Sequence, residues 1–152
     1  MRVLVWILED TWRATIAATA VLPVDAQITL LHVRASDPEA VARSAPHGLL
    51  GRRHSAPEEQ IHVMSEQSAR ELLVEAQTLL GRPALAEARR GRLEREVVAA
   101  AENMDLLVLA RDGDRSHPGP RSLGPAARFV VDHAPCAVLL VWPDTGARHQ
   151  SG

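Results

Sequence analysis

The sequence predicts an α/β fold, an open, doubly wound, five-stranded parallel sheet of order 3-2-1-4-5 with helices on both faces. Short runs of consecutive apolar residues alternate with segments of helical periodicity, which predicts the order βαβαβαβαβ. The apolar runs lack polar alternation, as is typical of strands that are buried on both faces. The chain has 152 residues, enough for one such domain with a sizeable core.

The first half of the chain predicts two strands around a helix. Val3–Leu8 is a continuous apolar run and is the first expected strand. Thr11–Val21 has helical character and ends before Pro23, which cannot continue a helix. Ile28–Val33 is the second apolar run, and residues 36–55 are rich in Pro, Ala, Gly and Arg, which predicts a loop.

A long helix is expected next. Ser55–Glu58 reads SAPE, a capping-box pattern with an early proline, so the helix should run to about Leu80. Gly81 and the proline two residues later should end it. Ala84–Ala88 has only a weak strand pattern and is the third expected strand.

The last part of the chain predicts two further helix–strand pairs. Arg92–Asn103 and Pro125–His133 are the expected helices, and Leu106–Ala110 and Cys136–Trp142 are the expected strands. Residues 1–143 should form a single domain, followed by a flexible polar tail at 144–152.

Three of these helices have an apolar or small face at helical spacing. The faces are Ala14, Ala17, Ala18 and Val21 in the first helix; Ile61, Met64, Ser68, Leu72, Ala76 and Leu79 in the second; and Leu93, Val97 and Ala101 in the third.

Composition excludes several classes of function. The net charge of −2 provides no basic field for nucleic acid or a membrane surface, so neither is an expected partner. There is no lysine, which rules out a Walker lysine, a Schiff base and a pyridoxal phosphate anchor. Cys136 is the only cysteine and cannot form an internal disulfide, which suits a reducing compartment. The apolar stretch near the N-terminus is too short for a signal or membrane segment, so a cytoplasmic location is expected.

The predicted topology places a ligand site at one edge of the sheet. Ligands of such sheets bind outside the carboxyl ends of the strands, where the strand order reverses. In the order 3-2-1-4-5 this point lies between strands one and four, next to the loops 9–12 and 111–124. The second loop contains glycines and leads into a helix N-terminus, which is a favourable arrangement for an anion.

The layout, the segment ITLLHV and the ending LGPAARFVVDHAPCAVLLV resemble the universal stress protein family over about residues 2–142. The resemblance implies a five-stranded parallel α/β sheet. Many members of that family dimerise through the last strand, and many, not all, bind ATP, so the resemblance implies both as expectations.

The ATP-binding members carry the motif G-x-x-G-x9-G-[ST] after the fourth strand. The matching residues here are Ala110, Gly113, Gly124 and Pro125, and ten residues rather than nine separate the two glycines. The family also places an aspartate at the tip of the first strand, where this chain has Leu8.

The resemblance therefore implies a nucleotide site with altered residues. Pro125 removes a hydroxyl and a backbone N–H that would face a phosphate, a loss of about 3–6 kcal/mol in binding. Arginines of the loop could compensate, or the loop could be an ordinary solvated surface. The candidate nucleotide-binding residues are Leu8, Glu9, Asp10, Val33, Ala110, Arg111, Gly113, Arg115, Arg121, Gly124, Pro125 and Ala126.

No catalytic residue and no metal ligand is expected. The seven histidines show no metal-binding spacing, and no serine lies in a GxSxG motif. His32, on a core strand, and His133, at a helix C-terminus, are interpreted as structural.

The last strand is expected to form a dimer. An apolar strand left bare at the edge of a sheet is an aggregation hazard, and pairing with a second copy removes it. The expected interface consists of Cys136, Val138, Leu139, Leu140, Val141 and Trp142.

Two functions follow from the sequence. The favoured one is a non-enzymatic, dimeric stress-response protein with a degraded ATP-binding motif and no required cofactor. The alternative is a universal stress protein that binds ATP or AMP through a remodelled phosphate loop, with slow ATP hydrolysis.

Overall fold

The computed structural model describes residues 1–36, 58–111 and 123–143, with side chains of the helix that starts at Glu58 described from Glu66 onward. The strands are β1 (Arg2–Trp6), β2 (Gln27–Ala35), β3 (Ala84–Gly91), β4 (Leu106–Ala110) and β5 (Ala137–Val141). The helices are α1 (Trp12–Ala18), extended by a 3-10 turn η1 (Thr19–Val21), α3 (Glu58–Leu80), α4 (Leu93–Ala100) and α5 (Pro125–His133). All the strand pairs are parallel, and the order β3-β2-β1-β4-β5 confirms the predicted topology. The expected tail at 144–152 lies outside the described residues.

The element boundaries lie within about three residues of the predicted ones. β4 and α5 match their predicted limits residue for residue. β3 continues to Gly91, beyond the predicted end, because its pairing with β2 runs from Ile28 through to Ala35. That backbone pairing holds the polar segment Arg89–Gly91 in the sheet, although an apolar pattern cannot predict it. β5 is shorter than predicted, and Cys136 and Trp142 flank it.

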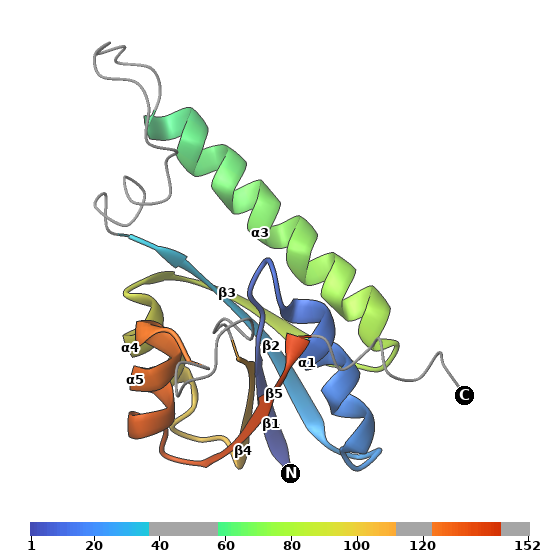
Figure 1. The fold of residues 1–152 in the computed structure, drawn as a ribbon. Coiled ribbons are helices and arrows are strands. Elements are labelled where there is room, and N and C mark those ends of the chain that lie inside the picture. Colours follow the sequence, from blue (N-terminus) through green and yellow to red (C-terminus); the bar gives the residue numbers. More distant parts are fainter. Residues whose placement is uncertain (37–57, 112–122, 144–152) are drawn as a thin grey trace.

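The helices form two layers around the sheet (Figure 1). α1 and α3 cover one face, and α4 and α5 cover the other. Successive strand residues point to opposite faces, so Val3 and Val5 pack toward α1 and α3, whereas Leu4 and Trp6 pack toward α4 and α5. None of the helices in the described part of the chain is both long and apolar enough to cross a membrane.

The predicted face of α1 is wrong. The helix buries Trp12, Thr15 and Ile16, whereas Ala17 is exposed. The hydroxyl of Thr15 donates to the carbonyl of Trp12 at 2.8 Å, and the hydroxyl of Thr19 donates to the carbonyl of Ile16 at 2.6 Å. Because the helix backbone satisfies these hydroxyls, the threonines can be buried beside the larger apolar side chains.

The predicted face of α3 is rotated by about one residue. Ala69, Leu73 and Ala76 are buried, whereas Ser68 is exposed and Leu79 is 53% exposed. The small alanines allow the helix to approach the strands closely, and Leu72 and Leu80 pack beside them. Ile61 and Met64 lie outside the described side chains.

The predicted face of α4 is confirmed. Val97 and Ala101 are fully buried, and Leu93 packs against the core formed with α5.

Candidate functional site

The reversal of strand order lies between β1 and β4, as predicted. The two strands are paired in parallel, with Val5 beside Val108, so their carboxyl ends meet at one edge. The chain leaves β1 toward α1 on one face and leaves β4 toward α5 on the other. In open parallel sheets, ligands bind where the chain diverges in this way. We call this side of the sheet the carboxyl edge.

The turn after β1 holds two exposed carboxylates. The carbonyl of Leu8 accepts hydrogen bonds from the N–H groups of Thr11 at 3.2 Å and Trp12 at 2.9 Å. These bonds close a turn in which Glu9 and Asp10 are exposed, whereas Leu8 is half-buried against the core of α4 and α5. A packing residue therefore stands where the resemblance implied an aspartate.

β2 supplies a buried tie at the same edge. The Nδ1 atom of His32 lies 2.9 Å from the carbonyl oxygen of Ile7, and the imidazole is buried. This contact joins the end of β1 to β2, which agrees with the structural role expected for His32. Val33 is also buried, and the guanidinium of Arg34 pairs with Glu66 at 3.1 Å.

The end of β4 is joined to the end of β5. Ala110 is almost completely buried, and the N–H of Arg111 donates to the carbonyl of Val141 at 2.7 Å. The guanidinium carbon of Arg111 lies 4.9 Å from the centre of the Trp142 ring, a cation–π contact. The arginine predicted to grip a phosphate is therefore engaged with the residue that follows β5.

α5 begins at the carboxyl edge with a proline. Gly124 is the N-cap, and Pro125 is the first helical residue. The carbonyl of Gly124 accepts the N–H of Arg128 at 2.9 Å, the first bond of the helix. Proline has no N–H, so this N-terminus presents one donor fewer than the helix ends that usually bind phosphate.

The structure brings some of the predicted site residues together and leaves others undescribed. Leu8, Val33 and Ala126 all contribute to the core between the sheet and the helices α4 and α5. Gly113, Arg115 and Arg121 lie outside the described residues, and their predicted roles are not tested.

Two buried polar atoms at this edge were not predicted from the sequence. The indole nitrogen of Trp6 and the hydroxyl of Thr11 are buried and have no hydrogen-bond partner among the described residues. Buried polar groups are normally paired, so each can donate to a ligand or a water. Strand alternation places Trp6 on the α5 side, but only the packing decides whether its N–H finds a partner.

Cys136 precedes β5 and therefore lies at the amino end of the strands, opposite the carboxyl edge. Burial raises the pKa of the Cys136 thiol above its ordinary value, and the carboxylate of Asp105 raises it further. A thiol with a raised pKa is a weak nucleophile at neutral pH. Among the described residues no group of at least three His, Cys, Asp or Glu side chains could hold a metal ion.

Comparison with known proteins gives one family match. The family model described as "Universal stress protein family" matches residues 9–141. No curated protein matches the chain.

Several solved structures share the fold. Universal stress protein UspA from Lactobacillus plantarum is 21% identical with a TM-score of 0.58, over 93% of this chain and 97% of that chain. A universal stress protein family protein from Arabidopsis thaliana with AMP bound is 19% identical with a TM-score of 0.62, over 99% and 97%. A universal stress protein in complex with cAMP is 18% identical with a TM-score of 0.59, over 94% and 97%. At these identities the likeness concerns the fold.

Proposed function

The chain belongs to the universal stress protein family, and from that premise we propose that it is a non-enzymatic stress-response protein that acts as a dimer and has a degraded ATP-binding motif. The observation that carries the proposal is the start of α5 at Pro125. A universal stress protein that keeps the family motif has a serine or threonine there, with both a hydroxyl and an N–H for the phosphates. Losing two charge-assisted bonds weakens binding by about 3–6 kcal/mol.

The proposed dimer forms through β5. Within the described residues this strand is paired only with β4, and Val138, Leu139, Leu140 and Val141 are half-buried in the single chain. A twofold axis would place two copies of β5 antiparallel at the centre of a continuous sheet. That arrangement satisfies the open backbone groups and covers the apolar side chains.

The proposal extends to location and partners. We propose a cytoplasmic protein, because a lone cysteine suits a reducing compartment. Its partner is a second copy of the chain rather than nucleic acid or a membrane, because the net charge is −2.

A second candidate is nucleotide binding through a remodelled site. It is favoured by the buried donors of Trp6 and Thr11 at the carboxyl edge, which have no hydrogen-bond partner among the described residues. Structures with the same fold have AMP or cAMP bound. In this case Trp6 and Thr11 would replace some of the donors that Pro125 removes.

Calorimetric titration of the full chain with ATP, ADP, AMP and cAMP tests the two candidates. The proposal expects a dissociation constant for ATP weaker than about 10 μM. Pro125→Ser should tighten ATP binding at least tenfold, because it restores an N–H and a hydroxyl. Pro135→Ser is the matched control, since this exposed proline lies beyond the other end of α5.

Tight binding by the wild type would favour the second candidate. Trp6→Phe, which removes only the indole N–H and part of the ring, should then weaken binding. Replacing Arg111, Arg115 and Arg121 together by Ala should also weaken it if arginines compensate for Pro125. An ATP hydrolysis rate above that of a buffer control would contradict the non-enzymatic role.

A further inference from the structure

The α4 side of the sheet is only partly covered. α4 has 8 residues and spans about 12 Å, whereas β3 also has 8 residues and spans about 26 Å. On the other face α3 has 23 residues, about 35 Å. Among the described residues, this short helix, which starts near the carboxyl edge, leaves the start of β3 largely uncovered. Leu85, near the start of β3, is 72% exposed.

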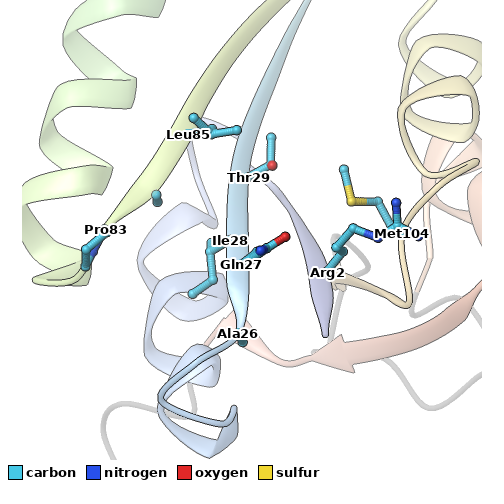
Figure 2. Close-up of a pocket in the computed structure, with 9 residues that line it drawn as sticks. Arg2, Ala26, Gln27, Ile28, Thr29, Pro83, Leu85 and Met104 are labelled. Carbon is cyan, nitrogen blue, oxygen red and sulfur yellow. The ribbon is translucent and has the colours of Figure 1, made fainter.

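A hollow lies on this bare surface (Figure 2). Its volume is about 640 Å³, within the range of about 300–1,000 Å³ typical of small-molecule sites. Its lining includes Arg2, Gln27, Thr29, Leu85 and Met104. It lies at the amino ends of β1, β2 and β3, away from the carboxyl edge.

The sheet register brings these side chains onto one face. Arg2 is paired with Gln27, and Thr29 is paired with Leu85. Leu4 of β1 and Leu31 of β2 point into the core beneath α4 and α5. Because side chains alternate along a strand, Arg2 and Thr29, two positions earlier, lie on the same face. Figure 2 shows Arg2 and Met104 on one side of the start of β2.

Arg2 and Gln27 are exposed in the hollow, whereas Thr29 is only 8% exposed. Within the described part of the chain, the side chains of Arg2, Gln27 and Thr29 make no hydrogen bond or ion pair. The neighbouring carboxylate of Asp105 accepts the backbone N–H of Arg2 at 2.6 Å, which fixes the start of β1. One guanidinium, an amide and a hydroxyl thus lie beside the apolar surface of Leu85 and Met104.

We propose that this hollow is a second binding site, for a small monocarboxylate with an apolar tail. The guanidinium of Arg2 pairs with the carboxylate, and Gln27 or Thr29 donates a further hydrogen bond to it. The tail covers Leu85 and Met104, which removes their exposed apolar surface from water. A single arginine beside an apolar wall suits one carboxylate better than a polyphosphate. The site is independent of the proposed nucleotide site at the opposite edge.

Titration of the full chain with sodium octanoate tests the proposal, with binding followed by calorimetry. Saturable binding of one octanoate per chain is expected. Octanol, which has the same tail without the charge, should bind at least tenfold more weakly. No saturable octanoate binding, or equal binding of octanol, would overturn the proposal.

Two substitutions locate the ligand. Leu85→Trp fills the hollow from an exposed position and should weaken octanoate binding at least tenfold; Val74→Trp, at an exposed position of α3, is its control and should leave binding unchanged. Arg2→Gln should weaken octanoate binding about tenfold without affecting octanol, and Arg13→Gln is its control. Circular dichroism verifies the fold of each variant. Unchanged octanoate binding in folded Leu85→Trp and Arg2→Gln would show that the ligand binds elsewhere.

Discussion

The two edge strands of the sheet differ in how they face solvent. β3 contains Glu87, Arg89 and Arg90, whereas β5 contains no charged residue. Charged side chains on an edge strand oppose unwanted pairing, and an apolar edge invites it. One sheet thus has an edge suited to water and an edge suited to a partner.

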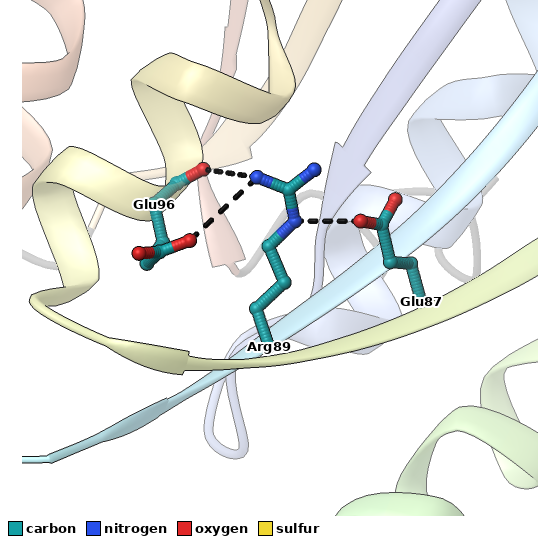
Figure 3. A network of polar contacts seen from close by, with 3 residues as sticks. All are labelled: Glu87, Arg89 and Glu96. Carbon is teal, nitrogen blue, oxygen red and sulfur yellow. Dashed lines mark hydrogen bonds and ion pairs between the residues drawn. The ribbon is translucent and has the colours of Figure 1, made fainter.

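The charges of β3 are arranged in a network (Figure 3). The Nε–H of Arg89 donates to Oε1 of Glu87 at 2.6 Å. Its Nη1 lies 3.6 Å from Oε2 of Glu96 and 3.5 Å from the Glu96 carbonyl oxygen. Arg89 therefore connects the edge strand β3 to α4.

The direction of the backbone N–H and C=O groups identifies the residues of β5 whose groups point away from β4. The carbonyl of Val141 accepts the N–H of Arg111, so the backbone of Val141 faces β4. The backbone groups of a strand alternate in direction, so Leu139 also faces β4, whereas Val138 and Leu140 face the open edge. By the same reasoning, the carbonyl of Gly91 accepts the N–H of Ser36, and the backbone of Ala86 faces away from β2.

The largest expected effect is on the dimer and comes from a proline on the open edge of β5, compared with a proline on the open edge of β3. Leu140→Pro removes an outward N–H of β5 and should raise the dissociation constant of the dimer at least 100-fold. Ala86→Pro removes an outward N–H of β3 and should leave the dimer intact. Sedimentation at low micromolar concentration measures the effect.

Leu140→Ala is the control for the lost side chain, because it keeps the N–H and should remain dimeric. Leu139→Pro is a poor test, since it would break the bonds to β4. A monomeric wild type, or a folded Leu140→Pro that stays fully dimeric, would contradict pairing through β5.

The thiol before β5 reports on the same edge. Cys136 is half-buried in the single chain, and its raised pKa keeps it protonated at neutral pH. Alkylation by iodoacetamide should therefore be slow at pH 7 and accelerate as the pH rises toward the raised pKa. Asp105→Asn removes the smaller cause of the shift and should speed alkylation at a given pH.

If a second copy covers β5, the thiol of monomeric Leu140→Pro should react about tenfold faster than that of the wild type. Equal rates would indicate that the partner leaves Cys136 open.

A smaller effect is expected where β3 ends. A Cβ atom on Gly91 would lie 2.7 Å from Oε1 and 2.8 Å from Cγ of Glu96. Gly91→Ala should displace Glu96 from Arg89 and lower the free energy of unfolding by about 1 kcal/mol. Urea denaturation measures the change, and the double variant Gly91→Ala with Glu96→Ala should recover most of it. No loss of stability in Gly91→Ala would show that Glu96 relocates freely.

The smallest effect concerns the charge network itself. Arg89→Gln should lower the free energy of unfolding by about 0.5 kcal/mol, because ion pairs that are partly exposed contribute little. The loss should shrink at high salt, which screens such pairs. Urea denaturation at two salt concentrations checks this, and a salt-independent loss would indicate that packing of the arginine stem matters more.

Sequence patterns predicted the strands and their order better than the helix faces. The apolar runs around β1, β4 and β5 identify strands because such segments are stable only when buried on both sides. The predicted face of α1 was wrong and that of α3 was rotated, with Leu72 and Ala76 but not Ser68 and Leu79 in the core, because small and aliphatic residues can lie on either side of a helix. Thr15 and Thr19 are buried only because the carbonyls one turn earlier accept their hydroxyl groups.

At the candidate site, too, some features were predictable from the sequence and others were not. The resemblance to the family identified Leu8, Ala110 and Pro125 as departures from its motif. It did not predict the contact of Arg111 with Trp142, nor that the buried nitrogen of Trp6 has no hydrogen-bond partner among the described residues. Both depend on which side chains meet across strands that lie far apart in the sequence.

By itself, then, the sequence determined the parallel sheet and its order, since continuous apolar runs joined by helical segments leave few other topologies. It also determined the chemistry of the two edges, because charge or its absence is a property of each strand alone. Only the tertiary structure decided which backbone groups of β5 face away from β4, how far the short α4 covers the sheet, and which buried polar atoms have no partner among the described residues. These properties depend on register and on relative lengths of packed elements, and neither quantity is encoded in any single segment.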